Sequence, residues 1–229
     1  MTHDFQISYR PMNDYLLKTR KDIVADAIRA SILRGTFKPG EKIDQQDIAD
    51  QLEVSRSPVR EAMRTLDAEG LITLIPNRGA VVTERSLREL EELYFTRRLL
   101  EGVAIERSVP NMDHAILKKL GSIIEQADET NDPEELLQLN NDFHMGTFNA
   151  CYQPILLNYT QQLRDMVAPY NRLYLDQAGN KQQAWEDHRR IYAACLERDG
   201  RDARVATELH LDRVIADLTN NIKKQRIQV

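Results

Sequence analysis

Arginine and serine side chains are concentrated in one short stretch of the sequence. Arg56 and Arg60 lie four residues apart, so on a helix they would project from one face. An arginine in such a position can donate two parallel hydrogen bonds to the O6 and N7 atoms of guanine. Ser55 and Ser57, together with the free amides at the start of a helix, suit DNA phosphates. With Arg64 one turn further on, the stretch predicts a helix that reads the major groove of DNA.

Histidines form a second group of residues with a possible chemical role. Three of the five histidines, His144, His188 and His210, fall inside runs with helical periodicity. Asn140 precedes His144 by four residues, so both would project from one helix face. Neutral imidazoles and an amide oxygen can surround a divalent metal such as Zn, Ni or Mn inside a helical bundle. Isolated histidines are more often structural, and spacing alone leaves that alternative open.

Three helices followed by a β-hairpin are predicted around the arginine-rich stretch, which is the order of a winged helix-turn-helix domain. In the third helix, Val59, Ala62 and Leu66 form an apolar stripe that leaves the arginines on the opposite side. The hairpin turn contains Arg78 beside Gly79, where Arg78 could enter the minor groove or contact the DNA backbone. Arginines on a helix are often only solvated charges, but the order of the elements favours a DNA-reading head. The helices are expected at residues 19–37, after Asp44 and at 55–70, and the strands at 71–75 and 80–83.

Beyond a polar, charged join, the sequence shows helical periodicity and no further strand signal. Breaks marked by proline, glycine and asparagine divide this region into six helices, which suit an antiparallel bundle. The predicted fold class is therefore mostly α. It comprises a winged helix-turn-helix domain at residues 1–83, a linker or first helical turn at 84–90 and an all-helical domain at 91–229. The helices are expected at residues 86–109, 112–129, 133–152, 154–175, 180–199 and 201–224.

Composition limits the class of protein. The 229 residues carry a net charge of −5, which by itself argues against a nucleic-acid partner. Residues 1–79 hold 12 basic and 12 acidic side chains and the rest holds 19 and 24, so DNA binding needs a local basic patch in the first third. Neither a membrane-spanning stretch nor a signal-peptide pattern is present, which predicts a cytoplasmic protein. Cys151 and Cys195 lack metal-site spacing and are expected to be buried, reduced thiols.

Several short motifs follow one another along the first third of the chain. They are Pro39-Gly40-Glu41-Lys42-Ile43, Ile48-Ala49, Leu52 through Arg56, Pro58 through Ala62, and Leu66 through Gly70-Leu71. On these motifs the region resembles the DNA-binding domain of the GntR family of bacterial regulators. The resemblance implies that Arg56 and Arg60 contact operator bases, that Ser55 and Ser57 assist, and that the wing dips toward the minor groove. Fatty-acid-responsive members carry an arginine at the position of Gln46, so Gln46 is expected among the DNA-contacting residues, with a different operator sequence.

A second set of motifs follows in the helical region. They are Arg97 through Leu100-Glu101, Asn140 through Phe143-His144, Asp187-His188-Arg189 through Ile191, and Ala206 through His210-Leu211. On these motifs, residues 84–224 resemble the FCD ligand-binding domain in its six-helix, VanR-like form. In metal-binding members the ligands are an Asp or Asn, a His four residues later and two further His, which implies Asn140, His144, His188 and His210. Asparagine in place of the commoner aspartate removes a negative charge and implies a lower affinity or a different metal.

The same resemblance implies an effector. Effectors of this family are mostly small organic acids, held partly by the metal and partly by an arginine on the first helix of the domain, here Arg97. Arg164, Arg172 and Tyr174 are further candidates for the pocket wall. An alternative for Arg97 is an ion pair with Glu101, four residues on in the same helix.

The sequence therefore predicts a ligand-responsive transcription regulator, a repressor by resemblance. It is expected to bind a palindromic operator as a homodimer, because a single winged helix covers too few base pairs to be selective. Two rival functions remain open. A metal-dependent enzyme would use His144, His188 and His210 to activate a water, although the sequence offers no HEXXH motif and no obvious acid/base partner. An architectural DNA-binding protein would use the bundle only for dimerisation.

Overall fold

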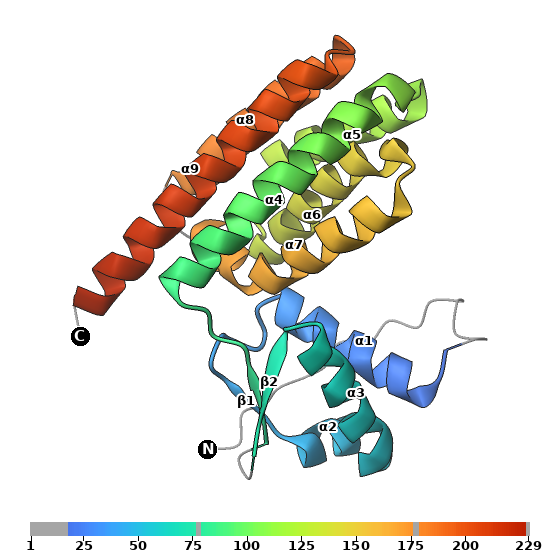
Figure 1. Cartoon of the computed structure of the whole chain (residues 1–229), viewed down its shortest axis with the longest axis vertical. Helices are drawn as coiled ribbons and strands as arrows, with labels where there is room; N and C mark the ends of the chain where they lie inside the picture. Colours follow the sequence, from blue (N-terminus) through green and yellow to red (C-terminus); the bar gives the residue numbers. More distant parts are fainter. Residues whose placement is uncertain (1–17, 77–78, 176–178, 228–229) are drawn as a thin grey trace. The chain divides into compact units, whose positions relative to one another are not determined.

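The structure, a computed structural model, describes residues 18–76, 79–175 and 179–227, and the side chains of residues 172, 173 and 225–227 lie outside this description. The chain separates into two compact units, Met1–Arg85 and Ser86–Val229 (Figure 1). Each unit has its own hydrophobic core. The two units can therefore be treated as separate domains, each with its own candidate site.

The first unit contains the helices α1 (Arg20–Leu33), α2 (Gln45–Gln51) and α3 (Arg56–Ala68). α1 begins at a capping box, in which the Thr19 hydroxyl accepts from the Asp22 amide and the Asp22 carboxylate accepts from the Thr19 amide. α2 begins directly after Asp44, as predicted, and the Asp44 carboxylate caps it by accepting from the amides of Gln46 and Asp47. Both α1 and α2 pack against α3, and Ile28 and Met63 are fully buried in their shared core. The packing of three helices positions α3 with one face in the core and one face outward.

A small antiparallel sheet completes the first unit. It consists of β1 (Lys42–Ile43), β2 (Ile72–Ile75) and β3 (Gly79–Val82) in the order β1-β3-β2. The β2–β3 hairpin agrees with the prediction, and Gly79 enters β3 at a φ of +90°, which glycine adopts without strain. β1 was not predicted, because two residues show no alternation and form a strand only by pairing with β3. Arg78, predicted at the tip of the wing, lies outside the described residues.

Helices are the only regular secondary structure in the described residues of the second unit, and α4 (Leu87–Ser108) and α9 (Gly200–Ile227) lie side by side along it (Figure 1). The predicted helix over 133–152 ends earlier, because the chain leaves α geometry and reaches Tyr152 at a left-handed φ of 53°. The mostly α fold class, with a winged helix-turn-helix unit and a helical bundle, is confirmed. The helices are α4 (Leu87–Ser108), α5 (His114–Glu129), α6 (Pro133–Phe148), α7 (Pro154–Leu175), α8 (Asn180–Leu196) and α9 (Gly200–Ile227), with the short 3₁₀ helices η2 (Val109–Asn111) and η3 (Asn149–Cys151).

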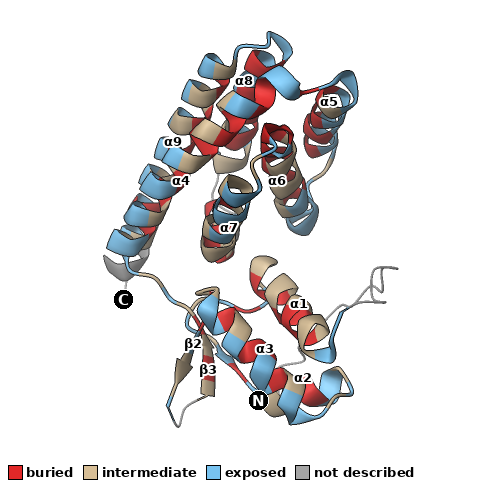
Figure 2. Ribbon diagram, turned by 45° about the vertical axis from the view of Figure 1, so that its right-hand side comes forward, coloured by how far each residue is buried: buried red, intermediate tan, exposed pale blue. Residues whose placement is uncertain are grey.

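Each helix of the second unit turns one buried stripe toward the bundle interior (Figure 2). Cys151 and Cys195 are free and buried, as predicted, and burial raises the pKa of Cys195 to about 12. In the described part of the chain, none of the helices combines the length and apolar character needed to cross a membrane. The interior of the bundle is not wholly apolar. It also holds Arg97, Glu101, His144, Arg164, Asp187, His188 and His210.

Candidate DNA-reading helix and metal centre

Helix α3 presents two chemically different faces. Val59, Met63 and Leu66 are fully buried against the rest of the first unit. The opposite face carries the five predicted DNA-contacting residues of this helix, all exposed: Ser55, Arg56, Ser57, Arg60 and Arg64. The structure therefore brings these side chains together on the solvent-facing side of α3.

The start of α3 leaves polar groups available to a phosphate. Ser55 occupies the N-cap position, but its side chain makes no capping hydrogen bond. Pro58 lies in the first turn, where an N–H would have no partner inside the helix. The remaining first-turn amides point outward with the positive end of the helix dipole, which favours an anion.

Gln46 contacts Arg56 in the free protein. The Arg56 Nε donates a hydrogen bond to the Gln46 Oε1, and the Gln46 Nε2 donates to the Asp50 Oδ1 at 2.6 Å. A guanidinium has five N–H donors, so the four on its terminal nitrogens stay available for a base. The sequence assigned Gln46 to direct DNA contact, whereas its position indicates that it also orients Arg56 from the neighbouring helix.

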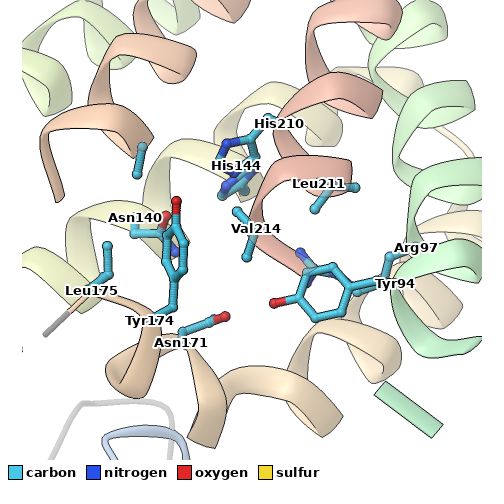
Figure 3. Close-up of a pocket in the computed structure, with 11 residues that line it drawn as sticks. Tyr94, Arg97, Asn140, His144, Asn171, Tyr174, Leu175, His210, Leu211 and Val214 are labelled. Carbon is cyan, nitrogen blue, oxygen red and sulfur yellow. The ribbon is translucent and has the colours of Figure 1, made fainter. Parts of the chain in front are cut away.

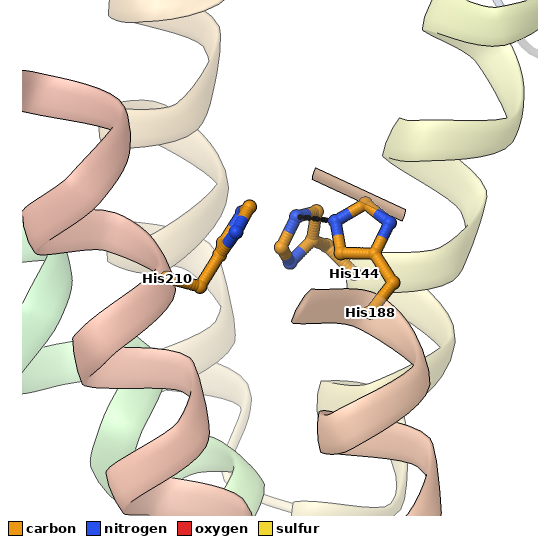
Figure 4. A group of neighbouring side chains, drawn as sticks. All are labelled: His144, His188 and His210. Atoms are coloured by element: carbon orange, nitrogen blue, oxygen red, sulfur yellow. Dashed lines mark hydrogen bonds between the residues drawn. The ribbon is translucent and has the colours of Figure 1, made fainter. Parts of the chain in front are cut away.

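Three helices of the second unit each bring one buried histidine to a common point (Figure 4). His144 of α6, His188 of α8 and His210 of α9 are 3%, 0% and 4% exposed. Their nearest ring nitrogens all lie within 4.8 Å of one another, and the Nε2 atoms of His144 and His188 are 3.2 Å apart. Two nitrogens bound to one metal at ~2.1 Å each lie ~3.0–3.4 Å apart in octahedral or tetrahedral geometry. The observed separation fits two ligands of one ion.

Burial and nearby positive charge favour the neutral, metal-binding form of His144 and His188. Burial lowers the pKa of His144 well below its usual 6.5, and the positive charge of Arg164 lowers it further. Burial also lowers the pKa of His188 well below that value, assisted by His210. Because a metal binds the neutral imidazole, these low pKa values leave the nitrogen lone pairs free at physiological pH. The three histidines can hold a metal ion, as the sequence predicted.

A small cavity adjoins the histidines (Figure 3). Asn140, half-buried on α6, lies beside His144 in its wall, so an amide oxygen is within the same site. The volume open to the centre of a water molecule is only about 20 Å³, which accommodates one or two waters or an ion. A ligand larger than that requires side chains to move. The lining residues are Tyr94, Arg97, Asn140, His144, Asn171, Tyr174, Leu175, Ala184, His210, Leu211 and Val214.

Arg97 is part of a buried charge cluster. Its Nε donates to the Glu101 Oε1 at 2.7 Å, and the Arg164 Nη1 donates to the Glu101 Oε2 at 3.3 Å. The alternative reading of Arg97, an ion pair within its own helix, is therefore present, and yet Arg97 also lines the cavity. Arg164, predicted for the pocket wall, is not among the residues that line the cavity and instead contacts Glu101 behind it. Two guanidiniums and one carboxylate leave an excess positive charge among side chains that are at most 5% exposed.

The Tyr174 hydroxyl has no hydrogen-bond partner among the described residues, whereas the Tyr94 hydroxyl lies near enough to Arg97 to interact with its guanidinium. Tyr174 was predicted for the pocket wall, whereas Tyr94 and Asn171 were not. Figure 3 shows the Tyr94 hydroxyl and the Asn171 amide directed toward the same space. Tyr94 lies one turn before Arg97, and that spacing was a signal that the sequence analysis did not use. The side chain of Arg172 lies outside the described residues.

Comparisons with known proteins identify the two domains. Residues 20–82 match the family described as "Bacterial regulatory proteins, gntR family", and residues 92–213 match the FCD domain. The regulator YdhC of Bacillus subtilis is 29% identical over 169 residues, covering 72% of this chain and 75% of that protein. The regulator McbR of Escherichia coli is 30% identical over 149 residues, covering 64% and 67%. The repressor GlaR of the same organism is 28% identical over 195 residues, covering 80% and 89%.

Solved structures agree at the level of the whole fold. The structure of E. coli McbR/YncC superposes with a TM-score of 0.80 and 26% identity, covering 89% of this chain and 99% of that one. A putative GntR regulator from Rhodococcus sp. RHA1 shares the fold, with a TM-score of 0.79, 21% identity and coverage of 89% and 99%. These relatives are transcription regulators, which confirms the prediction of a regulator rather than an enzyme.

A winged helix-turn-helix joined to an all-helical domain is the arrangement of a DNA-binding transcription regulator. The two matched regions cover most of the chain and identify its family. The protein belongs to the GntR family of bacterial regulatory proteins, in the FadR-like group whose C-terminal part is an FCD domain.

Proposed function

We propose that the protein is a repressor that binds a palindromic operator as a homodimer. A small organic acid releases it by binding beside a divalent metal held by Asn140, His144, His188 and His210. In this proposal Ser55, Arg56, Ser57, Arg60, Arg64 and the wing read the operator. The observation that carries the proposal is the excess positive charge of the Arg97, Arg164 and Glu101 cluster beside a cavity that is lined by His144 and His210, two of the three clustered buried histidines.

Charge favours an anionic effector. An uncompensated charge in a protein interior costs several kcal/mol. A carboxylate entering the cavity would offset this cost, because Arg97 lines the wall and a guanidinium pairs with a carboxylate through parallel hydrogen bonds. The hydroxyls of Tyr94 and Tyr174, which line the same cavity, are further donors for a carboxylate. The small free volume supports an acid of few atoms and a pocket that opens as the acid enters.

The purified protein is expected to carry close to one equivalent of Zn, Ni or Mn, and His144→Ala is expected to lose it, because one of three converging imidazoles is removed. Elemental analysis measures the metal, and operator affinity before and after chelation and metal return measures its effect. His114→Ala is the control, since His114 is exposed at the start of α5, outside the cluster. Equal metal content in both variants would contradict the site. An operator affinity indifferent to both chelation and carboxylates would favour a bundle that serves only in dimerisation.

An exposed apolar surface on α4 and α7 supports a dimer. Ile155 and Tyr159 are 75% and 56% exposed and line a hollow of about 550 Å³ with Leu100 of α4. Phe95 and Leu99 expose further apolar area on α4. Soluble monomers rarely leave such patches uncovered. A second copy of the chain is the occupant that an operator with two half-sites requires.

Ile155→Glu is expected to convert the dimer into a monomer, because a carboxylate would be buried against an apolar partner surface. Light scattering coupled to gel filtration measures the mass. Operator affinity should fall with it, since each head then binds a half-site alone. Leu196→Glu, at an exposed position at the end of α8 outside the hollow, is the control and should remain dimeric. A dimeric Ile155→Glu protein would exclude this surface as the interface.

A further inference from the structure

His210 differs from the other two histidines of the cluster in having a carboxylate partner. The Oδ2 of Asp187, on α8, lies 3.3 Å from the His210 Nδ1 on α9. Both side chains are 4% exposed. His144 and His188 instead face each other through their Nε2 atoms, and the His188 Nδ1 has no hydrogen-bond partner among the described residues. Of the three imidazoles, His210 is therefore the one that contacts a carboxylate, that of Asp187.

Asp187 is itself held in place. Arg213, one turn after His210 on α9, donates through Nη1 to the Asp187 Oδ1, and Gln183 donates to the same oxygen at 3.4 Å. The Asp187 Oδ1 accepts a hydrogen bond from the Arg213 guanidinium, and this leaves Oδ2 as the acceptor that faces the His210 ring. A carboxylate accepts only from a protonated nitrogen, so the proton of a neutral His210 resides on Nδ1. The lone pair is then on Nε2.

We propose that Asp187 is a positioning residue of the metal centre. It holds His210 in the tautomer and orientation in which Nε2 is free to bind the ion shared with His144 and His188. This inference rests on the metal site of the proposed function. Asp187 is not placed as a ligand, since the group of metal-ligating side chains found within the described residues comprises the three histidines alone.

The physical effect of such a partner is well defined. A carboxylate that accepts from the outer nitrogen of a metal-bound imidazole fixes the ring and raises the basicity of its other nitrogen, and its loss lowers metal affinity ~10–100-fold. The contact also joins α8 to α9, because Asp187 binds two residues one turn apart on α9. Metal binding at His210 is thereby linked to the packing of these two helices.

Asp187→Asn tests the proposal with an amide of the same size, which can donate to Nδ1 and favour the opposite tautomer. The Zn²⁺ dissociation constant, measured by competition with a chromophoric chelator, is expected to rise ~10–100-fold. Asp187→Glu, which keeps the charge, is expected to recover part of this loss. Asp128→Asn, which neutralises an exposed carboxylate on α5, is the matched control and should bind Zn²⁺ as the wild type does. Thermal unfolding of each variant shows that it is folded.

A second measurement needs neither a variant nor a metal. The ¹⁵N chemical shifts of the His210 ring in the metal-free full-length protein are expected to show a protonated Nδ1 and an unprotonated Nε2. The opposite tautomer, or a Zn²⁺ affinity of Asp187→Asn within twofold of the wild type, would overturn the proposal. A wild-type protein that binds no Zn²⁺, Ni²⁺ or Mn²⁺ would overturn this proposal together with the metal site. Normal binding by Asp187→Asn would overturn only the role of Asp187.

Discussion

Replacing Glu101 by glutamine is expected to lower the free energy of unfolding by about 3–5 kcal/mol. Glu101 is fully buried and is the carboxylate shared by Arg97 and Arg164. Glutamine keeps the shape of the side chain but removes its charge, so Arg97 and Arg164 would lose the buried carboxylate that they share. Most single substitutions cost less than this. Chemical denaturation of the full-length protein, followed by circular dichroism, measures the difference.

Two further variants, Glu92→Gln and Arg164→Met, distinguish the effect of an unpaired buried charge from the effect of a lost contact. Glu92→Gln breaks the exposed pair of Arg88 and Glu92 on the same helix and should change stability little, because solvent screens that pair. Arg164→Met removes a contact to Glu101 but leaves Arg97 and Glu101 as a neutral pair. It should therefore cost less than Glu101→Gln, although each variant disrupts the same cluster. Equal losses in Glu101→Gln and Glu92→Gln would show that Glu101 does not bridge buried arginines.

This cluster also marks the limit of sequence reasoning. The spacing of Arg97 and Glu101 predicted two alternatives, an ion pair within the helix or a ligand-binding arginine, and local spacing cannot choose between them. The choice depends on Arg164, which is 63 residues from Glu101 in the chain and on another helix. Tertiary packing allows Arg97 both to pair with Glu101 and to line the cavity. Because Glu101 is shared between two arginines, its single negative charge does not neutralise both of them. Such sharing leaves no periodic signal in the sequence.

Elements with a strong local pattern were predictable. The apolar stripe of α3 specified which face is buried, and hence that Arg56 and Arg60 face solvent. β1 was missed because its two residues form a strand only through a partner far along the chain. Asp187 carried a signal that was not used: it lies beside His188 in a run of α8 whose other buried positions include Ile191. A carboxylate at a buried position needs a partner, and that partner is on α9.

The DNA-reading face offers the largest expected effect on function. Replacing both Arg56 and Arg60 by alanine should weaken specific operator binding by about 2–6 kcal/mol, since a bidentate base contact contributes about 1–3 kcal/mol. This corresponds to a loss of about 30-fold to more than 10⁴-fold in affinity. Stability should change little, because both side chains are exposed. Titration of the full-length protein against an operator selected by the wild type from random duplexes, at fixed salt, measures the effect.

The comparison that decides the role of these arginines is the ratio of specific to non-specific affinity. Arg88→Ala removes an equally exposed arginine from α4 and should leave that ratio unchanged. If Arg56 and Arg60 contacted only phosphates, the double variant would bind all sequences more weakly and the salt dependence would become shallower by about one unit per lost contact, with the ratio intact. If Arg56 and Arg60 contact base edges, the ratio of specific to non-specific affinity should instead fall sharply in the double variant. Gln46→Ala should then fall between the wild type and the double variant, because it leaves both guanidiniums in place but releases Arg56 from its support on α2.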